Sequence, residues 1–217
     1  VLGILFAAAT AATAPGVYAQ DTKPKQPDAP KKDEPSLKGT WKGEVLVATT
    51  CPGSVTFFAH DRHERLLANH LAQGKRGVFV DDDGNVVAGE GKFRYLAPLS
   101  KIPVTRNGTI RFQVENVLAA TAAAWALGIP WETIRHGLAT FVSDAKTAPG
   151  RFNVFNHGDA TIIADYGHNP DAIRSLVQAV ENIPANHRIV VISGAGDRRD
   201  SDIREQTEIL GEAFDDV

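Results

Sequence analysis

The chain has 217 residues, of which 43% are apolar, and its net charge is −3. This length exceeds the usual domain size of about 100–150 residues, so we expect one domain and part of another. The slightly acidic balance and the scattered Lys and Arg residues exclude a nucleic-acid interface built on a basic patch. Because Cys51 is the single cysteine, an internal disulfide and a multi-cysteine metal site are excluded as well.

The first fifty residues differ in composition from the rest. Residues 1–19 contain an apolar, alanine-rich stretch that is too short to span a bilayer, and residues 17–19 have the small-residue pattern of a signal-peptidase site. Residues 20–44 are rich in Pro, Lys and Asp, which predicts a disordered linker. A junction of two reading frames around residues 45–51 would account for this change in composition.

Apolar periodicity predicts three elements in the next part of the chain: a strand at 55–58, a helix at 60–73 and a strand at 77–80. The acidic segment 81–85 then predicts a hairpin turn, since Gly84 and Asn85 both accept positive φ. This region therefore indicates a strand, helix and hairpin succession.

Two patterns in this region resemble metal sites but lack a required ligand. An EF-hand loop counted from Asp81 needs glycine at position six and glutamate at position twelve, where Val86 and Lys92 stand. A helical zinc site of the metalloprotease type needs histidine at position 67, where Leu67 stands. We therefore expect neither a calcium site nor a zinc site in this region, and we place the polar residues of the helix on its solvent-facing side: His60, His63, Glu64 and His70.

Further along, residues 109–112 predict a strand that leads into an alanine-rich helix at 114–127. Gly128 is expected to end this helix, and Pro130 to open another that runs to about Phe141. The small side chains of the first helix would let it approach a sheet closely.

The carboxyl-terminal part carries the densest group of polar side chains. Residues 161–164 predict a short buried strand, and Pro170 can begin the helix after it. A further strand is expected at 188–192, before a glycine-rich loop that opens another helix. Because ligands of open α/β sheets bind outside the carboxyl ends of strands, residues 165–169 are placed to bind a nucleotide.

Four motifs in this order resemble the Mur ligase family: RFQVENVLAATAAAWALGIPWETI, PGRF, DYGHNPDAI and GAGDRRD. Within the family they are most similar to the Mur-like carboxyl-terminal half of the cyanophycin synthetases, and the resemblance covers about residues 51–217. It implies an α/β fold, with the end of a central P-loop-type ATPase domain at 45–148 and the first part of a Rossmann-like C-terminal domain at 149–217. The chain is thus expected to be a fragment of a longer enzyme.

The resemblance also implies roles for individual residues. Asn116 would lie near adenine, Arg151 would bind phosphate, and Asp165 would bind ribose. The remaining nucleotide-facing candidates are Tyr166, His168 and Asn169, and those on the substrate side are Asp197 and Arg198. The family's His-Asn pair is replaced by Phe112-Gln113. Each side chain also has an ordinary structural interpretation, as a helix-end cap, a turn residue or a solvated charge. No catalytic residue is assigned.

The implied activity is ATP-dependent ligation through an acyl phosphate, with Mg²⁺, which adds arginine to the aspartate side chains of a poly-Asp backbone. The expected partners are ATP, an amino acid and an Asp/Arg polymer, with no nucleic acid and no membrane span; a homo-oligomer is left open. A peptidoglycan-precursor Mur ligase and an exported binding or structural protein are the alternatives. The expected location is cytoplasmic, or periplasmic if residues 1–19 act as an export signal.

Because the sequence contains no G-x-x-x-x-G-K-[ST] phosphate loop, we expect no ATP hydrolysis by this chain alone.

Overall fold

A computed structural model describes residues 2–6, 50–193 and 199–217. Most of the export-like segment, the linker at 20–44 and the substrate-side candidates Asp197 and Arg198 lie outside the described residues. The part of the export-like segment that is described, Leu2–Phe6, forms a strand paired within a sheet. Among the helices of the described ranges, none combines the length and the apolar character needed to cross a bilayer.

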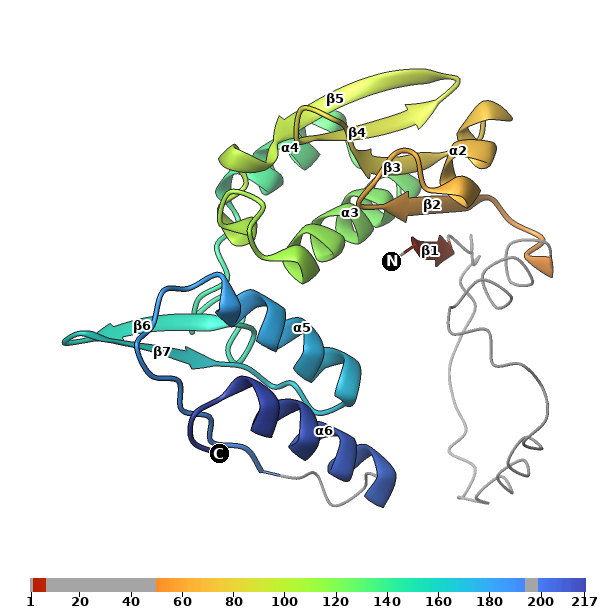
Figure 1. Ribbon diagram of the computed structural model, residues 1–217. Helices are drawn as coiled ribbons and strands as arrows, with labels where there is room; N and C mark the ends of the chain where they lie inside the picture. The colour runs from red at the N-terminus through yellow and green to blue at the C-terminus, as the bar shows by residue number, and fades with distance from the viewer. Residues whose placement is uncertain (1, 7–49, 194–198) are drawn as a thin grey trace, which may run out of the picture.

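A five-stranded mixed sheet organises the first half of the molecule (Figure 1). Its strands, in spatial and chain order, are β1 (Leu2–Phe6), β2 (Val55–Ala59), β3 (Gly77–Val80), β4 (Asn85–Glu90) and β5 (Lys92–Pro98). Strands β2 and β3 pair in parallel and are connected by the crossover helix α2 (Arg65–Ala72). The other neighbouring strands pair antiparallel. The predicted strands at 55–58 and 77–80 are confirmed, with one added residue in β2.

The predicted hairpin turn between β3 and β4 is confirmed, but of the two residues expected to accept positive φ only Gly84 does so, since Asn85 already begins β4. The Asp81 carboxylate accepts hydrogen bonds from the backbone N–H groups of Asp83 and Asn85, at 3.1 and 2.8 Å. Gly84 has a φ of 77°, which is a conformation that glycine adopts without strain. The side chain of Asp81 thus organises the turn locally, as short acidic residues commonly do.

Helix α2 is shorter than expected. It begins at Arg65 because the Glu64 carboxylate accepts hydrogen bonds from the N–H groups of Leu66 and Leu67 and so caps the first turn. The expectation that His70 faces solvent is wrong. Its side chain is buried, its Nε2 lies 3.1 Å from the Val55 carbonyl oxygen, and its ring packs edge-on against Phe57. His70 therefore fastens α2 to β2.

Acidification is expected to destabilise this attachment. Burial lowers the pKa of His70 in the folded chain, because it disfavours the charged ring. The unfolded chain therefore binds the proton at a higher pH, and the free energy of unfolding falls as the pH falls through the ordinary histidine range. Urea unfolding at about pH 8 and about pH 5 should show this loss, with a smaller loss in His70→Gln, which does not titrate. Equal losses in both proteins would contradict the assignment.

Two short 3-10 turns, η1 (Leu99–Lys101) and η2 (Pro103–Thr105), lead from β5 to a pair of helices, α3 (Arg111–Ala126) and α4 (Trp131–Thr140). Both predicted helices are confirmed, and Gly128 follows α3 with a φ of 75°. The predicted strand at 109–112 is wrong. Ile110 N–H bonds back to the Thr105 carbonyl, which closes a loop through the left-handed Arg106, so that Arg111 already begins α3.

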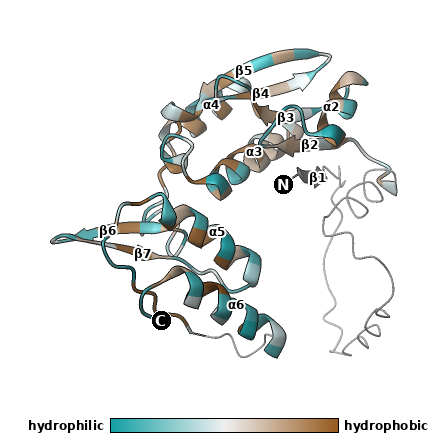
Figure 2. Ribbon diagram, in the orientation of Figure 1, coloured by the Kyte–Doolittle hydropathy of each residue, from teal (hydrophilic) through white to brown (hydrophobic). Residues whose placement is uncertain are grey.

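The main core lies between α3 and the sheet. Its fully buried members are Val78 and Val86 from the strands and Val114, Leu118 and Ala122 from α3. Figure 2 shows hydrophobic colours along β2, β3 and α3, whereas α6 is predominantly hydrophilic. Burial of this apolar surface is the dominant stabilising contribution to such a layered unit.

The second half of the molecule consists of a hairpin and two helices: β6 (Asn153–His157), β7 (Ala160–Ala164), α5 (Pro170–Glu181) and α6 (Asp200–Ala213). An ion pair between Arg174 and Glu205 joins α5 to α6. A small core joins this part to the first half, since the Phe112 ring at the start of α3 meets the Phe152 ring edge-on, with centroids 5.5 Å apart. This contact holds the two parts on either side of the cavity described below.

Two expectations for this part are wrong. The strand at 161–164 forms, but its side chains are largely exposed because β7 pairs only with β6 among the described strands. Residues 188–192 form no strand, and Ile189 makes an isolated bridge to Asp216 instead. A buried strand needs neighbours on both sides, and residues 188–192 do not find them in the described structure.

Candidate functional site

A cavity of about 480 Å³ lies where the start of α3, the segment between α4 and β6, and the β7–α5 loop meet. All six residues with a predicted nucleotide role line this one cavity: Asn116, Arg151, Asp165, Tyr166, His168 and Asn169. They come from three segments that are distant in sequence. The fold thus gathers an amide, a guanidinium, a carboxylate, a phenol ring and an imidazole around a single space of a size typical for small-molecule sites.

The wall contributed by α3 carries two amide side chains. Asn116 Nδ2 donates a hydrogen bond to Gln113 Oε1 over 3.3 Å, and this bond orients the Asn116 amide. Asn116 itself is exposed, while Gln113 is buried. One turn of helix separates the two residues, so the geometry follows directly from the helical repeat.

The opposite wall is aromatic and cationic. The Arg151 guanidinium carbon lies 5.8 Å from the centroid of the Tyr166 ring, within the range of a cation–π contact. Tyr166 is 66% exposed, and its ring lies 5.3 Å from that of His168. His168 Nδ1 is 2.9 Å from the Tyr166 carbonyl oxygen. In the neutral tautomer with a proton on Nδ1, the ring donates to that carbonyl and keeps Nε2 as an acceptor.

Two of the candidate side chains also hold the backbone. Asn169 caps α5, because its Oδ1 accepts the Ala172 N–H at 2.8 Å. Asp165 does not cap this helix; its Oδ2 instead accepts the Phe152 N–H at 2.9 Å. Each side chain therefore uses one polar atom to hold the backbone, and its second polar atom can serve a ligand in the cavity.

Several lining residues carry no motif in the sequence: Phe141, Ser143, Ala148, Ser175 and Leu176. Their position becomes apparent only when the segment between α4 and β6 turns back toward α5. Ser143 shows this, since its hydroxyl donates to the Arg151 carbonyl over 2.6 Å. The signal that could have indicated Ser143 is its place shortly before the PGRF motif.

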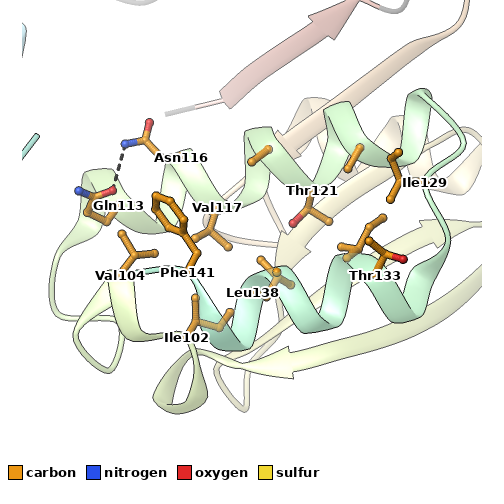
Figure 3. Close-up of a pocket in the computed structure, with 14 residues that line it drawn as sticks. Ile102, Val104, Gln113, Asn116, Val117, Thr121, Ile129, Thr133, Leu138 and Phe141 are labelled. Carbon is orange, nitrogen blue, oxygen red and sulfur yellow. Dashed lines mark hydrogen bonds between the residues drawn. The ribbon is translucent and has the colours of Figure 1, made fainter. Parts of the chain in front are cut away.

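An apolar groove of about 410 Å³ adjoins the cavity between α3 and α4 (Figure 3). It shares Gln113, Asn116 and Phe141 with the cavity, and Figure 3 shows the Asn116–Gln113 hydrogen bond at one end of it. Its other walls are formed by side chains such as Ile102, Val117 and Leu138. The polar groups needed to orient a nucleotide's phosphates line the cavity and not this groove.

The fit of a magnesium ion can be judged from the donor set. Among the described residues, no three His, Cys, Asp or Glu side chains gather in a way that could hold a metal ion. Asp165 is the single carboxylate among the described residues that line the cavity, and one of its oxygens accepts a backbone hydrogen bond. Magnesium binds through one or two carboxylates together with substrate phosphates. The described residues alone do not form a magnesium site, so no step is assigned to the metal.

Comparison with known proteins gives the following similarities. Residues 150–217 match the family described as Mur ligase, glutamate ligase domain. Cyanophycin synthetase from Synechocystis sp. is 33% identical over 174 residues, which are 80% of this chain and 20% of that protein. UDP-N-acetylmuramoyl-L-alanyl-D-glutamate--2,6-diaminopimelate ligase from Alkaliphilus metalliredigens is 33% identical over 121 residues, which are 55% of this chain and 23% of that protein.

Among solved structures, MurF from Acinetobacter baumannii is similar with 20% identity and a TM-score of 0.43, over 70% of this chain and 34% of that one. The chain spans about a fifth of the length of the cyanophycin synthetases it matches.

Proposed function

We propose that this chain supplies part of the nucleotide site of an ATP-dependent ligase, which joins a carboxylate to an amine. The proposal is supported by the match of residues 150–217 to the Mur ligase family. The observation that carries this proposal is the cavity in which Asn116, Arg151 and Asp165 meet. Residues 45–148 would then be the last part of an ATPase-type central domain. The proposed location is the cytoplasm, where ATP is supplied.

The proposed reaction has two steps. A substrate carboxylate attacks the γ-phosphorus of ATP to form an acyl phosphate and ADP; the amine then attacks the acyl carbon, forming the amide and releasing phosphate and a proton. Charge builds up on the transferring phosphoryl oxygens, so positioning and electrostatic stabilisation supply most of the catalysis. Arg151 fits this task because its planar guanidinium binds two phosphate oxygens at once.

The other lining residues suit the remainder of the nucleotide. The Tyr166 ring offers a flat, exposed face against which a base or sugar packs. Asp165 would accept a ribose hydroxyl through the oxygen not bonded to Phe152, and Asn116 would pair with the adenine edge. These roles agree with the chemistry of each group at its place in the cavity.

For the substrates, we propose arginine as the amine and an aspartate side chain as the carboxylate. The support is the match to the cyanophycin synthetase of Synechocystis sp., which is 33% identical over 80% of this chain, whereas a diaminopimelate ligase from Synechococcus elongatus is 29% identical over 78% of it. A peptidoglycan-precursor ligase remains the second candidate, because the diaminopimelate ligase from Alkaliphilus metalliredigens is also 33% identical over the residues it shares with this chain.

Binding of ATP to the purified 217-residue chain tests the proposed function. Titration with ATP at low salt should shift the amide NMR signals of Arg151, Asp165, Tyr166 and His168, and leave those of α2 unchanged. The reason is that the former line the cavity, whereas no residue of α2 does. Unchanged signals around the cavity at millimolar ATP, or shifts confined to other surfaces, would overturn the proposal.

A further inference from the structure

The turn that carries Arg151 is held in an unusual backbone conformation. Gly150 has a φ of 70°, and Phe152 has a φ of 52°. The left-handed region is accessible to glycine but costs a bulky side chain such as that of phenylalanine about 1–3 kcal/mol. Such a conformation persists only when surrounding contacts fix it, so the contacts of this turn determine where Arg151 lies.

One buried side chain makes three of these contacts. Asn153, the first residue of β6, is 2% exposed and does not line the cavity. Its Oδ1 accepts the Gly150 N–H at 2.7 Å, while its Nδ2 donates to the Ala148 carbonyl at 3.0 Å and, more weakly, to the Arg151 carbonyl at 3.5 Å. A single amide therefore joins both ends of the turn.

Three further hydrogen bonds support the turn from outside. Asp165 Oδ2 accepts the Phe152 N–H, the Ser143 hydroxyl donates to the Arg151 carbonyl, and the Tyr166 N–H donates to the Gly150 carbonyl at 2.9 Å. Tyr166 and Asp165 also line the cavity together with Arg151. These hydrogen bonds connect the turn at 148–152 to Asp165 and Tyr166, and the Arg151 guanidinium lies over the Tyr166 ring.

We propose that Asn153 is a positioning residue for Arg151: by locking the turn at 148–152 it presents the guanidinium to the nucleotide cavity. This inference rests on the proposed function for its link to ATP. The amide is required in both of its capacities, because it accepts from one backbone group and donates to others. An aspartate of the same shape could still accept from Gly150 but could not donate to Ala148, so the turn would loosen on one side.

Asn153→Asp and Asn153→Ala are expected to weaken ATP binding by about five- to tenfold, since a displaced guanidinium loses its alignment with the phosphates. The matched control is Asn156→Asp, which makes the same chemical change at an exposed position of the same strand, β6, and should bind ATP as the wild type does. Circular dichroism and thermal unfolding establish that each variant is folded.

A purely structural role is separated from a positioning role by a double-mutant cycle. If Asn153 acts through Arg151, its substitution has no further effect on ATP affinity once Arg151 is alanine. Equal losses of affinity in the presence and absence of Arg151, or unchanged affinity in both Asn153 variants, would overturn the inference.

A second readout needs no nucleotide. In the ligand-free wild type, nuclear Overhauser effects should join the Arg151 side chain to the Tyr166 ring, and Asn153→Ala should abolish them. Persistence of these effects in Asn153→Ala would refute the positioning role by itself. If the wild type bound no ATP but Asn153→Ala still abolished the Overhauser effects, the proposed function would fail while the positioning role stood.

Discussion

Replacement of Arg151 by alanine is expected to weaken ATP binding to the chain by about ten- to hundredfold. Hydrogen bonds to charged groups contribute about 1.5–3 kcal/mol, which corresponds to this change in affinity. Among the described residues that line the cavity, Arg151 is the only Arg or Lys side chain, so no neighbouring Arg or Lys replaces it. Isothermal titration calorimetry with ATP at low ionic strength measures the loss, since salt screens a contact at this exposed position.

Two further variants make the Arg151 experiment specific. Arg151→Lys retains the positive charge but loses the planar fork, so its affinity should lie between those of the wild type and the alanine variant. Arg204→Ala removes an exposed arginine from α6, away from the lining residues, and should leave the affinity unchanged. If Arg204→Ala weakened binding as much as Arg151→Ala does, the effect would reflect the net charge of the protein and not a contact in the cavity.

The elements that can be predicted from the sequence are those with local signals. Helix α5 carries a 3.6-residue apolar repeat, and α3 is an alanine-rich run of good helix formers. Helices α3, α4 and α5 each have a glycine or proline at an end, and the predicted bounds agree with the structure to within about three residues. The family resemblance is confirmed, because four ordered motifs are far more specific than any one pattern. A mixed α/β fold is confirmed, and the family match applies to residues 150–217.

The errors arise where the outcome depends on distant contacts. Residues 188–192 are as apolar as a buried strand, but a strand forms only when a neighbour pairs with it. The sequence predicts a solvent-facing His70, whereas its burial follows from the Val55 carbonyl fifteen residues earlier in the chain. The Asn153 amide gives no sequence signal, since its function in the turn depends on a left-handed Phe152 that no residue pattern indicates.

The candidate site illustrates the same division. Its members are predicted from motif order, and the structure places all six in one cavity. What the sequence does not predict is how Asp165 and Asn169 divide their polar atoms between backbone and cavity. Those hydrogen bonds depend on the relative position of the β7–α5 loop and the Phe152 turn, which is set by packing and not by local sequence.

The greatest loss of stability is expected from Leu118→Ala in the middle of α3. Leu118 is 0% exposed and belongs to the core between this helix and the sheet. Removing a buried leucine side chain loses its transfer free energy and leaves a cavity, which together cost about 2–5 kcal/mol. Because small domains are stabilised by only about 5–15 kcal/mol, this change should lower the urea midpoint markedly in far-ultraviolet circular dichroism.

The chain offers a matched control for this substitution. Leu127, at the carboxyl end of the same helix, is 78% exposed, so Leu127→Ala makes the identical chemical change without opening a buried cavity and should alter the free energy of unfolding by less than about 0.5 kcal/mol. Because α3 also carries Asn116, the ATP affinity of folded Leu118→Ala indicates whether the helix still holds its place in the cavity wall. Similar urea midpoints for the two variants would show that α3 does not pack on the sheet through Leu118, and the cavity would then lose one of its walls.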